Sequence, residues 1–232
     1  MHPDRDLGSL PPIVTTQPER PAPQGFFVAF EGPEGAGKSS QMARLVARLH
    51  DHGFDPVVTR EPGGSPAGEC IRAVLLDPDL RLEPLSELLL YAAARAQHVI
   101  ELIAPALAAG RLVLTDRFRA ASVAYQAYGR ELDLRFVEAL NERVTGGLKP
   151  DLTILLDLPP ELGLARVAAR GATDRLERAD LAFHARVRQG FLAQAQNDPG
   201  RWRVIAARHD EARVADSIWE ALEPALRAWR SG

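Results

Sequence analysis

The sequence predicts an α/β domain built on a five-stranded parallel sheet with helices on both faces. Apolar segments alternate with segments of helical periodicity, which is typical of such sheets. Several apolar segments are continuous, as expected for strands that are buried on both faces. With 232 residues, of which 46% are hydrophobic and 25% charged, the chain suits one globular domain of this class.

Five segments are predicted to be strands, and each is short, apolar and bounded by turn or polar residues. Because helices separate them, we expect the strands to run parallel and to be joined by right-handed crossovers. The predicted strands are Gly25–Glu31, Pro56–Arg60, Arg111–Thr115, Asp151–Leu158 and Arg201–Ala206.

Helical periodicity fills the intervals between these strands, and most of the helices end at glycine or proline turns. We expect the long helix Pro84–Ala109 to bend at Pro105, because proline lacks an N–H and its ring clashes with the preceding turn. The other predicted helices are Lys38–His52, Pro66–Leu76, Asp133–Val144, Pro160–Ala169, Ala179–Gln196 and Asp210–Trp229.

No internal repeat or linker interrupts the chain after its first 24 residues. We therefore predict one domain over residues 25–232. Residues 1–24 contain six prolines and no apolar core of a signal peptide, so they are predicted to form a flexible tail.

The loop Gly32–Ser39 reads G-x-x-x-x-G-K-S and joins the first predicted strand to the first predicted helix. Glycines let backbone N–H groups converge on an anion, and the helix start adds donors and a partial positive charge. Lys38 is predicted to reach the terminal phosphates of a nucleoside triphosphate, and the Ser39 hydroxyl to ligate Mg²⁺. The alternative is a glycine-rich hairpin that happens to contain a lysine, and the strand and helix on either side argue against it. The predicted triphosphate-binding residues are Gly32, Pro33, Glu34, Gly35, Ala36, Gly37, Lys38, Ser39 and Ser40.

Polar clusters follow the second and third predicted strands, at the sheet edge where ligands bind in parallel α/β folds. Asp116 is predicted to hold Mg²⁺ directly or through water, and Arg117 to grip phosphate oxygens. The alternative for this pair is an exposed ion pair in a turn. In the cluster Thr59–Gly64, which is also a turn, spacing alone does not decide whether Arg60 or Glu61 faces an acceptor.

Tyr91 and Arg95 lie four residues apart in a predicted helix and therefore share a face. A ring and an arginine so placed can stack on a base and hold its monophosphate. Tyr125, with Gln126 and after Ser122, gives a second aromatic residue on a segment just past Asp116 and Arg117. Core packing is the alternative for each of the aromatic residues.

Four arginines fall within 13 residues around Gly171, at positions 166, 170, 175 and 178. A solvated charged face is the usual explanation of such a run. In phosphoryl transfer the same run serves as a lid, here about 166–178, which excludes water and places arginines on the charge of the moving group.

In combination these motifs resemble the thymidylate kinase family, over nearly the whole chain from residue 25 to about residue 229. The resemblance implies a P-loop NTPase fold with a short lid, and transfer of the γ-phosphoryl group of ATP to dTMP in the presence of Mg²⁺. The segments that carry it are Phe30–Ser39, Thr59–Gly64, Tyr91–Arg95, Asp116–Arg117, Ala124–Gln126 and Pro150–Thr153 with Leu156–Asp157.

The resemblance also implies roles for individual residues. Tyr91 would stack on thymine, Arg95 and Arg117 would hold the acceptor phosphate, and Tyr125 would lie against the deoxyribose. The implied substrate-binding set is Glu34, Arg60, Tyr91, Arg95, Arg117, Ser122, Tyr125 and Gln126, and the implied metal set is Ser39, Asp116 and Glu34.

One position of the phosphate loop indicates which subgroup of this family the chain resembles. Some members have an arginine directly after the acidic residue of the loop, where this chain has Gly35. The resemblance then implies the bacterial type, in which the lid supplies the catalytic arginines, with Glu177 as a lid glutamate. The implied catalytic set is Lys38, Arg117, Arg170 and Arg175.

Composition and net charge limit the kinds of partner and the cellular compartment that the sequence predicts. A net charge of −3 and a pI near 6.1 argue against a surface that coats nucleic acid, and no apolar run is long enough to predict a membrane span. The single cysteine, Cys70, fits a reducing, cytoplasmic compartment. The resemblance implies a homodimer packed through Pro84–Ala109 and Asp133–Val144.

Two alternative functions remain open on sequence grounds. A related kinase could act on another nucleoside monophosphate or on a deoxynucleoside, although a deoxynucleoside kinase would not need two arginines for an acceptor phosphate. A nucleotide-dependent switch or ATPase would not need the aromatic and arginine cluster on the acceptor side.

Overall fold

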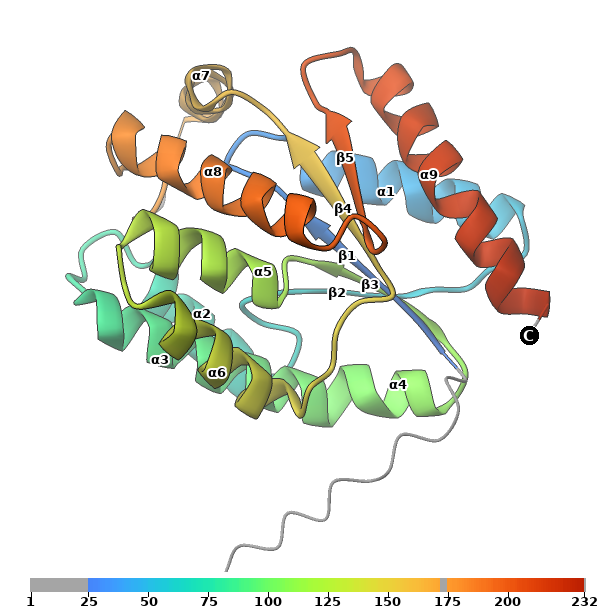
Figure 1. Cartoon of the computed structure of the whole chain (residues 1–232), viewed down its shortest axis with the longest axis horizontal. Coiled ribbons are helices and arrows are strands. Elements are labelled where there is room, and N and C mark those ends of the chain that lie inside the picture. Colours follow the sequence, from blue (N-terminus) through green and yellow to red (C-terminus); the bar gives the residue numbers. More distant parts are fainter. Residues whose placement is uncertain (1–24, 172–174, 232) are drawn as a thin grey trace, which may run out of the picture.

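The computed structural model describes residues 25–171 and 175–231, and contains one central parallel sheet (Figure 1). The predicted tail and the middle of the predicted lid lie outside the described residues. The strand order is β2-β3-β1-β4-β5, which confirms the predicted five-stranded parallel sheet. Each strand bound lies within one residue of its prediction: β1 Phe26–Glu31, β2 Val57–Arg60, β3 Leu112–Asp116, β4 Leu152–Asp157 and β5 Trp202–Ala206.

Strand β1 shows why the apolar runs are continuous. Alternate residues of β1 enter different cores, so both faces of the strand are buried. Phe26, Val28 and Phe30 pack under α1 (Lys38–Asp51) and α9 (Glu211–Ser231). Phe27 and Ala29 pack on the opposite side of the sheet, against the helices drawn below it in Figure 1.

The remaining helices largely follow the predicted intervals. None of those in the described part of the chain is both long and apolar enough to cross a membrane. The helices outside α1 and α9 are α2 Pro66–Leu76, α3 Pro84–His98, α4 Ala104–Ala108, α5 Arg119–Ser122, α6 Leu134–Thr145, α7 Pro160–Arg170 and α8 Leu181–Asn197, with π-helical turns η1 Val99–Ile103 and η2 Val123–Gly129.

Two helical segments differ from the sequence prediction. The long predicted helix is interrupted by the π-helical turn η1 just before Pro105, and α4 begins at Ala104. A widened turn there is consistent with the missing N–H and the bulk of the proline ring. The pair α5–η2 was not predicted at all, because residues 120–127 are buried throughout and show no amphipathic period.

Helix α7 packs against the phosphate loop through two glycines. A Cβ atom on Gly163 would lie 2.3 Å from the Glu34 carbonyl oxygen, and a Cβ atom on Gly35 would lie 2.2 Å from the Gly163 carbonyl oxygen. Gly35 also has a φ of +69°, which side chains disfavour. This contact leaves no room for a side chain at position 35, and it sets the loop against the helix that leads to the lid.

We expect Gly163→Ala to weaken triphosphate binding although residue 163 is distant from the loop in sequence. Overpacking of this kind costs about 1–3 kcal/mol, which corresponds to a roughly 5- to 150-fold loss of affinity if the loop absorbs the shift. Isothermal titration with a non-hydrolysable ATP analogue measures the effect. Leu162→Ala, at an exposed position of the same helix, is the matched control. Unchanged affinity in Gly163→Ala would show that the loop does not depend on this contact.

Candidate active site

The phosphate loop has the geometry of an anion cradle. Gly32 and Gly37 have φ values of +148° and +86°, and Gly37 caps the N-terminus of α1. The Lys38 ammonium group donates to the carbonyl oxygens of Gly32 and Pro33, both at 3.1 Å. Burial, and then the positive charge of Arg117, lower the pKa of Lys38. The two carbonyl dipoles balance the charge of the Lys38 ammonium group only in part. An anion bound in the loop would supply a full negative charge in their place.

Ser39 and Asp116 meet beside the loop, where β3 ends. The Ser39 hydroxyl donates to Asp116 Oδ2 at 3.1 Å, and Asp116 Oδ1 is buried without a hydrogen-bond partner in the described part of the chain. The described residues contain no group of three or more His, Cys, Asp or Glu side chains that could form a metal cage. Mg²⁺ commonly takes one or two protein oxygens together with phosphate and water, so this pair fits that ion.

Glu34, Arg117 and Tyr125 form a compact polar cluster on the other side of the loop. Glu34 Oε1 accepts from the Arg117 guanidinium at 2.7 Å and from the Tyr125 hydroxyl at 2.6 Å. Burial alone would raise the pKa of Glu34, but Arg117 and then Lys38 outweigh burial and hold it at about 2. Burial raises the pKa of Tyr125, so its hydroxyl group keeps its proton and donates.

The backbone of Arg117 is unusual, with a φ of +71° in the left-handed region. The Arg117 side chain donates to the Gly32 carbonyl oxygen at 3.1 Å and lies over the Tyr125 ring, 4.8 Å from its centroid. The residue therefore connects the end of β3, the phosphate loop and η2. Such strain is common at functional sites.

A cavity of about 290 Å³, which we call the central cleft, joins most of the predicted site residues. It lies between the loop and the first turns of α1 on one side and α3 on the other. The predicted residues that line it are Glu34, Gly35, Gly37, Lys38, Ser39, Ser40, Arg60, Tyr91, Asp116, Arg117 and Arg170.

Arg60 and Glu61, between which sequence spacing did not decide, both line the central cleft. Arg60 is exposed and bonded to Glu69, at 3.0 and 2.9 Å. Glu61 is buried, and its Oε2 accepts from Arg95 Nε at 2.7 Å. Of the two, Arg60 can reach an acceptor directly, whereas Glu61 holds another predicted site residue.

Arg95 lies beneath the central cleft, with 1% of its surface exposed. Its guanidinium donates to Ser122 Oγ at 2.8 Å, to Asn141 Oδ1 at 2.6 Å and to the Phe118 carbonyl oxygen at 3.1 Å, in addition to Glu61. Arg95 and Ser122 are therefore bonded to each other, and neither is among the residues that line the cleft. Their predicted contact with an acceptor stays a prediction.

The lid arginines point in different directions. Arg170 lines the central cleft and donates to Glu177 Oε1 at 2.7 Å. Arg175 instead donates to the buried carboxylate of Glu87 and to the Leu75 carbonyl oxygen. Gln126, predicted on the acceptor side, donates to the same Glu87 at 2.8 Å.

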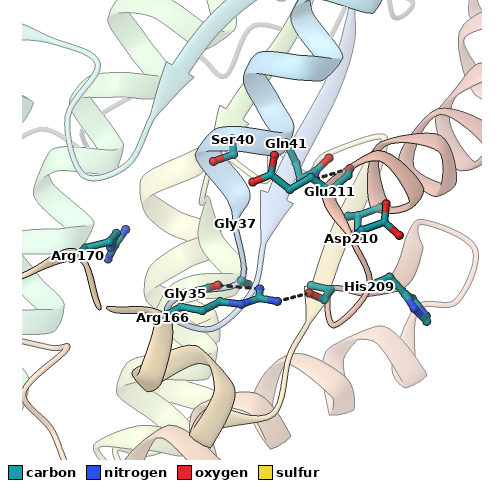
Figure 2. A pocket seen from close by; sticks show the side chains of 12 residues that line it. Gly35, Gly37, Ser40, Gln41, Arg166, Arg170, His209, Asp210 and Glu211 are labelled. Carbon is teal, nitrogen blue, oxygen red and sulfur yellow. Dashed lines mark hydrogen bonds between the residues drawn. The ribbon is translucent and has the colours of Figure 1, made fainter. Parts of the chain in front are cut away.

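A second cavity of about 470 Å³, the outer pocket, opens on the other side of the loop (Figure 2). Arg166 reaches from α7 to the carbonyl oxygens of Gly35 and Ala207, at 3.3 and 3.2 Å. Gln41 of α1 donates to the Glu211 carbonyl oxygen at 3.0 Å. Sequence reasoning missed this pocket, because the segment after β5 carries no motif, and it also missed Arg72 and Leu176 in the central cleft.

Glu31, at the end of β1, is a fully buried carboxyl group next to the site. Its Oε1 accepts from the Phe118 amide at 2.9 Å, and Oε2 has no hydrogen-bond partner among the described residues. Burial raises its pKa from 4.5 to about 8, against the opposing effect of Arg117. Glu31 therefore stays protonated at pH values where the unfolded chain releases the proton.

We expect the Glu31 carboxyl group to make the protein less stable as the pH rises from 4.5 towards 8. Over this window the folded state binds the proton that the unfolded state loses, so the free energy of unfolding falls. Glu31→Gln has no proton to lose, so its stability relative to the parent should increase with pH. Urea unfolding at pH 5, 6.5 and 8 measures this difference. A difference that is constant over these pH values would contradict the expectation.

Comparison with known proteins agrees with this geometry. The family model for thymidylate kinase matches residues 30–218. The thymidylate kinase of Deinococcus radiodurans is 54% identical over 199 residues, which cover 86% of this chain and 97% of that protein. That of a Synechococcus strain is 52% identical over 201 residues, with 87% and 96% covered. The crystal structure of thymidylate kinase from Ehrlichia chaffeensis superposes with a TM-score of 0.71 at 32% identity, with 86% and 98% covered. The chain therefore belongs to the thymidylate kinase family.

Proposed function

We propose that this chain transfers the γ-phosphoryl group of ATP to dTMP, giving dTDP for dTTP synthesis. The observation that carries the proposal is the central cleft. One wall of it is a phosphate loop with Lys38, and the opposite wall presents Tyr91 of α3. Arg117, at the end of β3, lines the cleft beside the loop. A triphosphate and a nucleoside monophosphate can therefore meet in one cavity, as the family's reaction requires.

ATP is proposed to bind on the loop side. The loop amides and Lys38 would hold the phosphates, and the outer pocket would take the adenosine, since Gly35, Gly37 and Ser40 line both cavities. Arg166 lies between the loop and the segment after β5 and would sit close to the nucleoside. Arg170 also lines both cavities and is placed for the charge of the phosphates.

dTMP is proposed to bind against the other wall. Tyr91 would stack on the base, Arg60 and Arg117 would hold the phosphate, and Glu34 would face the deoxyribose. Direct contact of Arg95, Ser122, Tyr125 and Gln126 with dTMP stays a prediction. In this structure these four side chains are buried and bonded to neighbouring protein groups.

The chemistry requires positioning and neutralisation of charge more than acid–base catalysis. The acceptor oxygen of dTMP is already anionic, so the main obstacle is repulsion between two phosphate groups. Lys38, Arg117 and Arg170 bring positive charge to this point of the cleft. Lys38 would exchange its two loop carbonyl partners for phosphate oxygens.

Mg²⁺ is proposed to bind between Ser39 and Asp116, whose free oxygen atom offers a ligand. When bound, it would neutralise part of the triphosphate charge. Glu34, the third predicted ligand, is bonded to Arg117 and Tyr125, and its contact with the metal stays a prediction.

A homodimer and a cytoplasmic location are proposed with this function. Helix α3 packs beside α2 and α6, and large apolar side chains are exposed on these elements and on η1. A second copy of the chain would cover them. The exposed apolar side chains are Val74, Leu85, Leu89, Ile100, Leu134 and Phe136.

The exposed thiol of Cys70 is compatible with a reducing cytoplasm.

A panel of nucleoside monophosphates and deoxynucleosides with Mg-ATP tests the substrate. We expect kcat/KM for dTMP to exceed that for the other nucleotides by on the order of 10² or more, because polar groups of the cleft would be left unpaired by the wrong base. Preference for another acceptor would establish the related-kinase alternative, and ATP hydrolysis indifferent to dTMP would establish the switch or ATPase.

Lys38→Ala should lower kcat by on the order of 10²–10³ while the protein stays folded.

Sedimentation tests the proposed dimer. At micromolar concentration the parent chain should sediment as a dimer, and Leu89→Glu, which places a charge on the exposed face of α3, should sediment as a monomer. Leu162→Glu, on an exposed position of α7, controls for a charge elsewhere on the surface. A monomeric parent at this concentration would refute the dimer.

A further inference from the structure

Glu87 is a fully buried acidic residue that the reaction described above does not use. It lies on α3, and its carboxylate accepts hydrogen bonds from three side chains of two other segments. Gln126 of η2 donates at 2.8 Å, Arg130 at the end of η2 donates at 3.1 Å, and Arg175 donates through Nη1. Glu87 therefore joins α3 to η2 and to the segment that contains Arg175.

The position of Glu87 along α3 relates it to the proposed dTMP site. Glu87, Tyr91 and Arg95 are spaced four residues apart, so they follow one another along one face of the helix, about 6 Å per step. Tyr91 lines the central cleft, and Arg95 lies beneath it. Glu87 therefore lies one helical turn beyond the residue proposed to stack on the base.

Arg175 connects Glu87 to the described end of the lid, the turn formed by residues 175–178, which we call the lid turn. The next residue, Leu176, is buried, lines the central cleft and belongs to an apolar cluster with Tyr125, against which Tyr91 packs. Glu177 follows and accepts from Arg170 on the loop side of the cleft. The lid turn thus covers the cleft from the Glu87 side to the ATP side.

Charge makes the contact between Glu87 and Arg175 specific. The Glu87 side chain is fully buried, and the side chain of Arg175 is 11% exposed. The second arginine on the carboxylate, Arg130, is more exposed, at 25%. Removing one partner from a buried ion pair leaves an uncompensated charge and is strongly destabilising, so the bond between Arg175 and Glu87 fixes the position of the lid turn.

We propose that Glu87 is a positioning residue for dTMP. Through Arg175 it holds the lid turn, with Leu176, against Tyr91, and through Gln126 it fixes the neighbouring element η2. The assignment of dTMP as the ligand rests on the proposed function. Arg175 accordingly serves the acceptor side of the cleft, whereas the arginine cluster in the sequence had predicted that it acts on the moving phosphoryl group.

Steady-state kinetics with dTMP varied at saturating Mg-ATP test this role. Glu87→Gln, which keeps the shape and loses the charge, should raise KM for dTMP by on the order of tenfold, with KM for ATP and kcat changed by less than about twofold. Arg175→Met should do the same. Because the two residues act through each other, the double variant should be no worse than the worse single variant. Glu83→Gln is the matched control and should equal the parent, because Glu83 is an exposed glutamate at the N-cap of α3, four residues before Glu87, and its side chain does not cap the helix.

Arg170→Ala provides the contrast, since an arginine that acts on the transferred group lowers kcat. The proposal is overturned if Arg175→Met also lowers kcat with KM for dTMP unchanged. It is equally overturned if the effects of Glu87→Gln and Arg175→Met multiply in the double variant.

Limited trypsin digestion provides a readout that does not depend on catalysis or on the identity of the acceptor. In a folded Glu87→Gln protein, cleavage after Arg170 and Arg178 should be faster than in the parent and in Glu83→Gln by about tenfold, because the freed lid turn is open for a larger fraction of the time. Equal cleavage rates would show that the contact between Glu87 and Arg175 does not hold the lid turn in place. Faster cleavage with an unchanged KM for dTMP refutes the positioning role. If the monophosphate panel instead finds no transfer to dTMP, the proposed function fails, and the cleavage rates still decide whether Glu87 holds the lid turn.

Discussion

The arrangement of the site depends on Arg117, whose left-handed backbone places one guanidinium among three segments. The Arg117 amide donates to the Phe30 carbonyl oxygen in β1, and its side chain contacts Gly32, Glu34 and Tyr125. Arg117 therefore contacts the phosphate loop, the end of β3 and η2 at once, and it adds to the direct bond from Tyr125 to Glu34. The backbone strain is sustained because several bonds, one of them a short ion pair, depend on the same conformation.

A second constraint is that the cationic side chains of the site already have partners within the protein. Lys38 is bonded to loop carbonyl groups, Arg95 to Glu61, Arg170 to Glu177, and Arg175 to Glu87. Lys38, Arg95 and Arg175 are buried or nearly so and require such partners, because an isolated charge in the interior is costly, whereas Arg170 is exposed. Substrate phosphates would therefore replace protein partners of graded strength. The weakest of these partners are the neutral carbonyl groups on Lys38, which is the residue proposed to exchange them for phosphate oxygens.

The same partners explain how far the site could be predicted. The motifs located Lys38, Ser39, Asp116, Arg117 and Tyr91 correctly at one cavity, because strand ends of a parallel sheet converge. Motif spacing does not report hydrogen-bond partners. It therefore did not show that Arg175 is bonded to Glu87, or that Ser122 is bonded to Arg95. The face shared by Tyr91 and Arg95 also contains Glu87 one turn earlier, and this helical spacing was a signal that sequence reasoning could have followed.

The sequence by itself determined the five parallel strands, most helix bounds and the phosphate loop, because these depend on local periodicity, glycine and proline. Tertiary structure decided what depends on contacts between distant segments. It placed Gly163 against Gly35, buried α5–η2 on all sides, and shaped the outer pocket from α1, α7 and the segment after β5. It also placed Arg170 at the loop side of the cleft and bonded Arg175 to Glu87 of α3. No local pattern encodes these outcomes, since each depends on which buried charge or backbone atom the packed neighbours present.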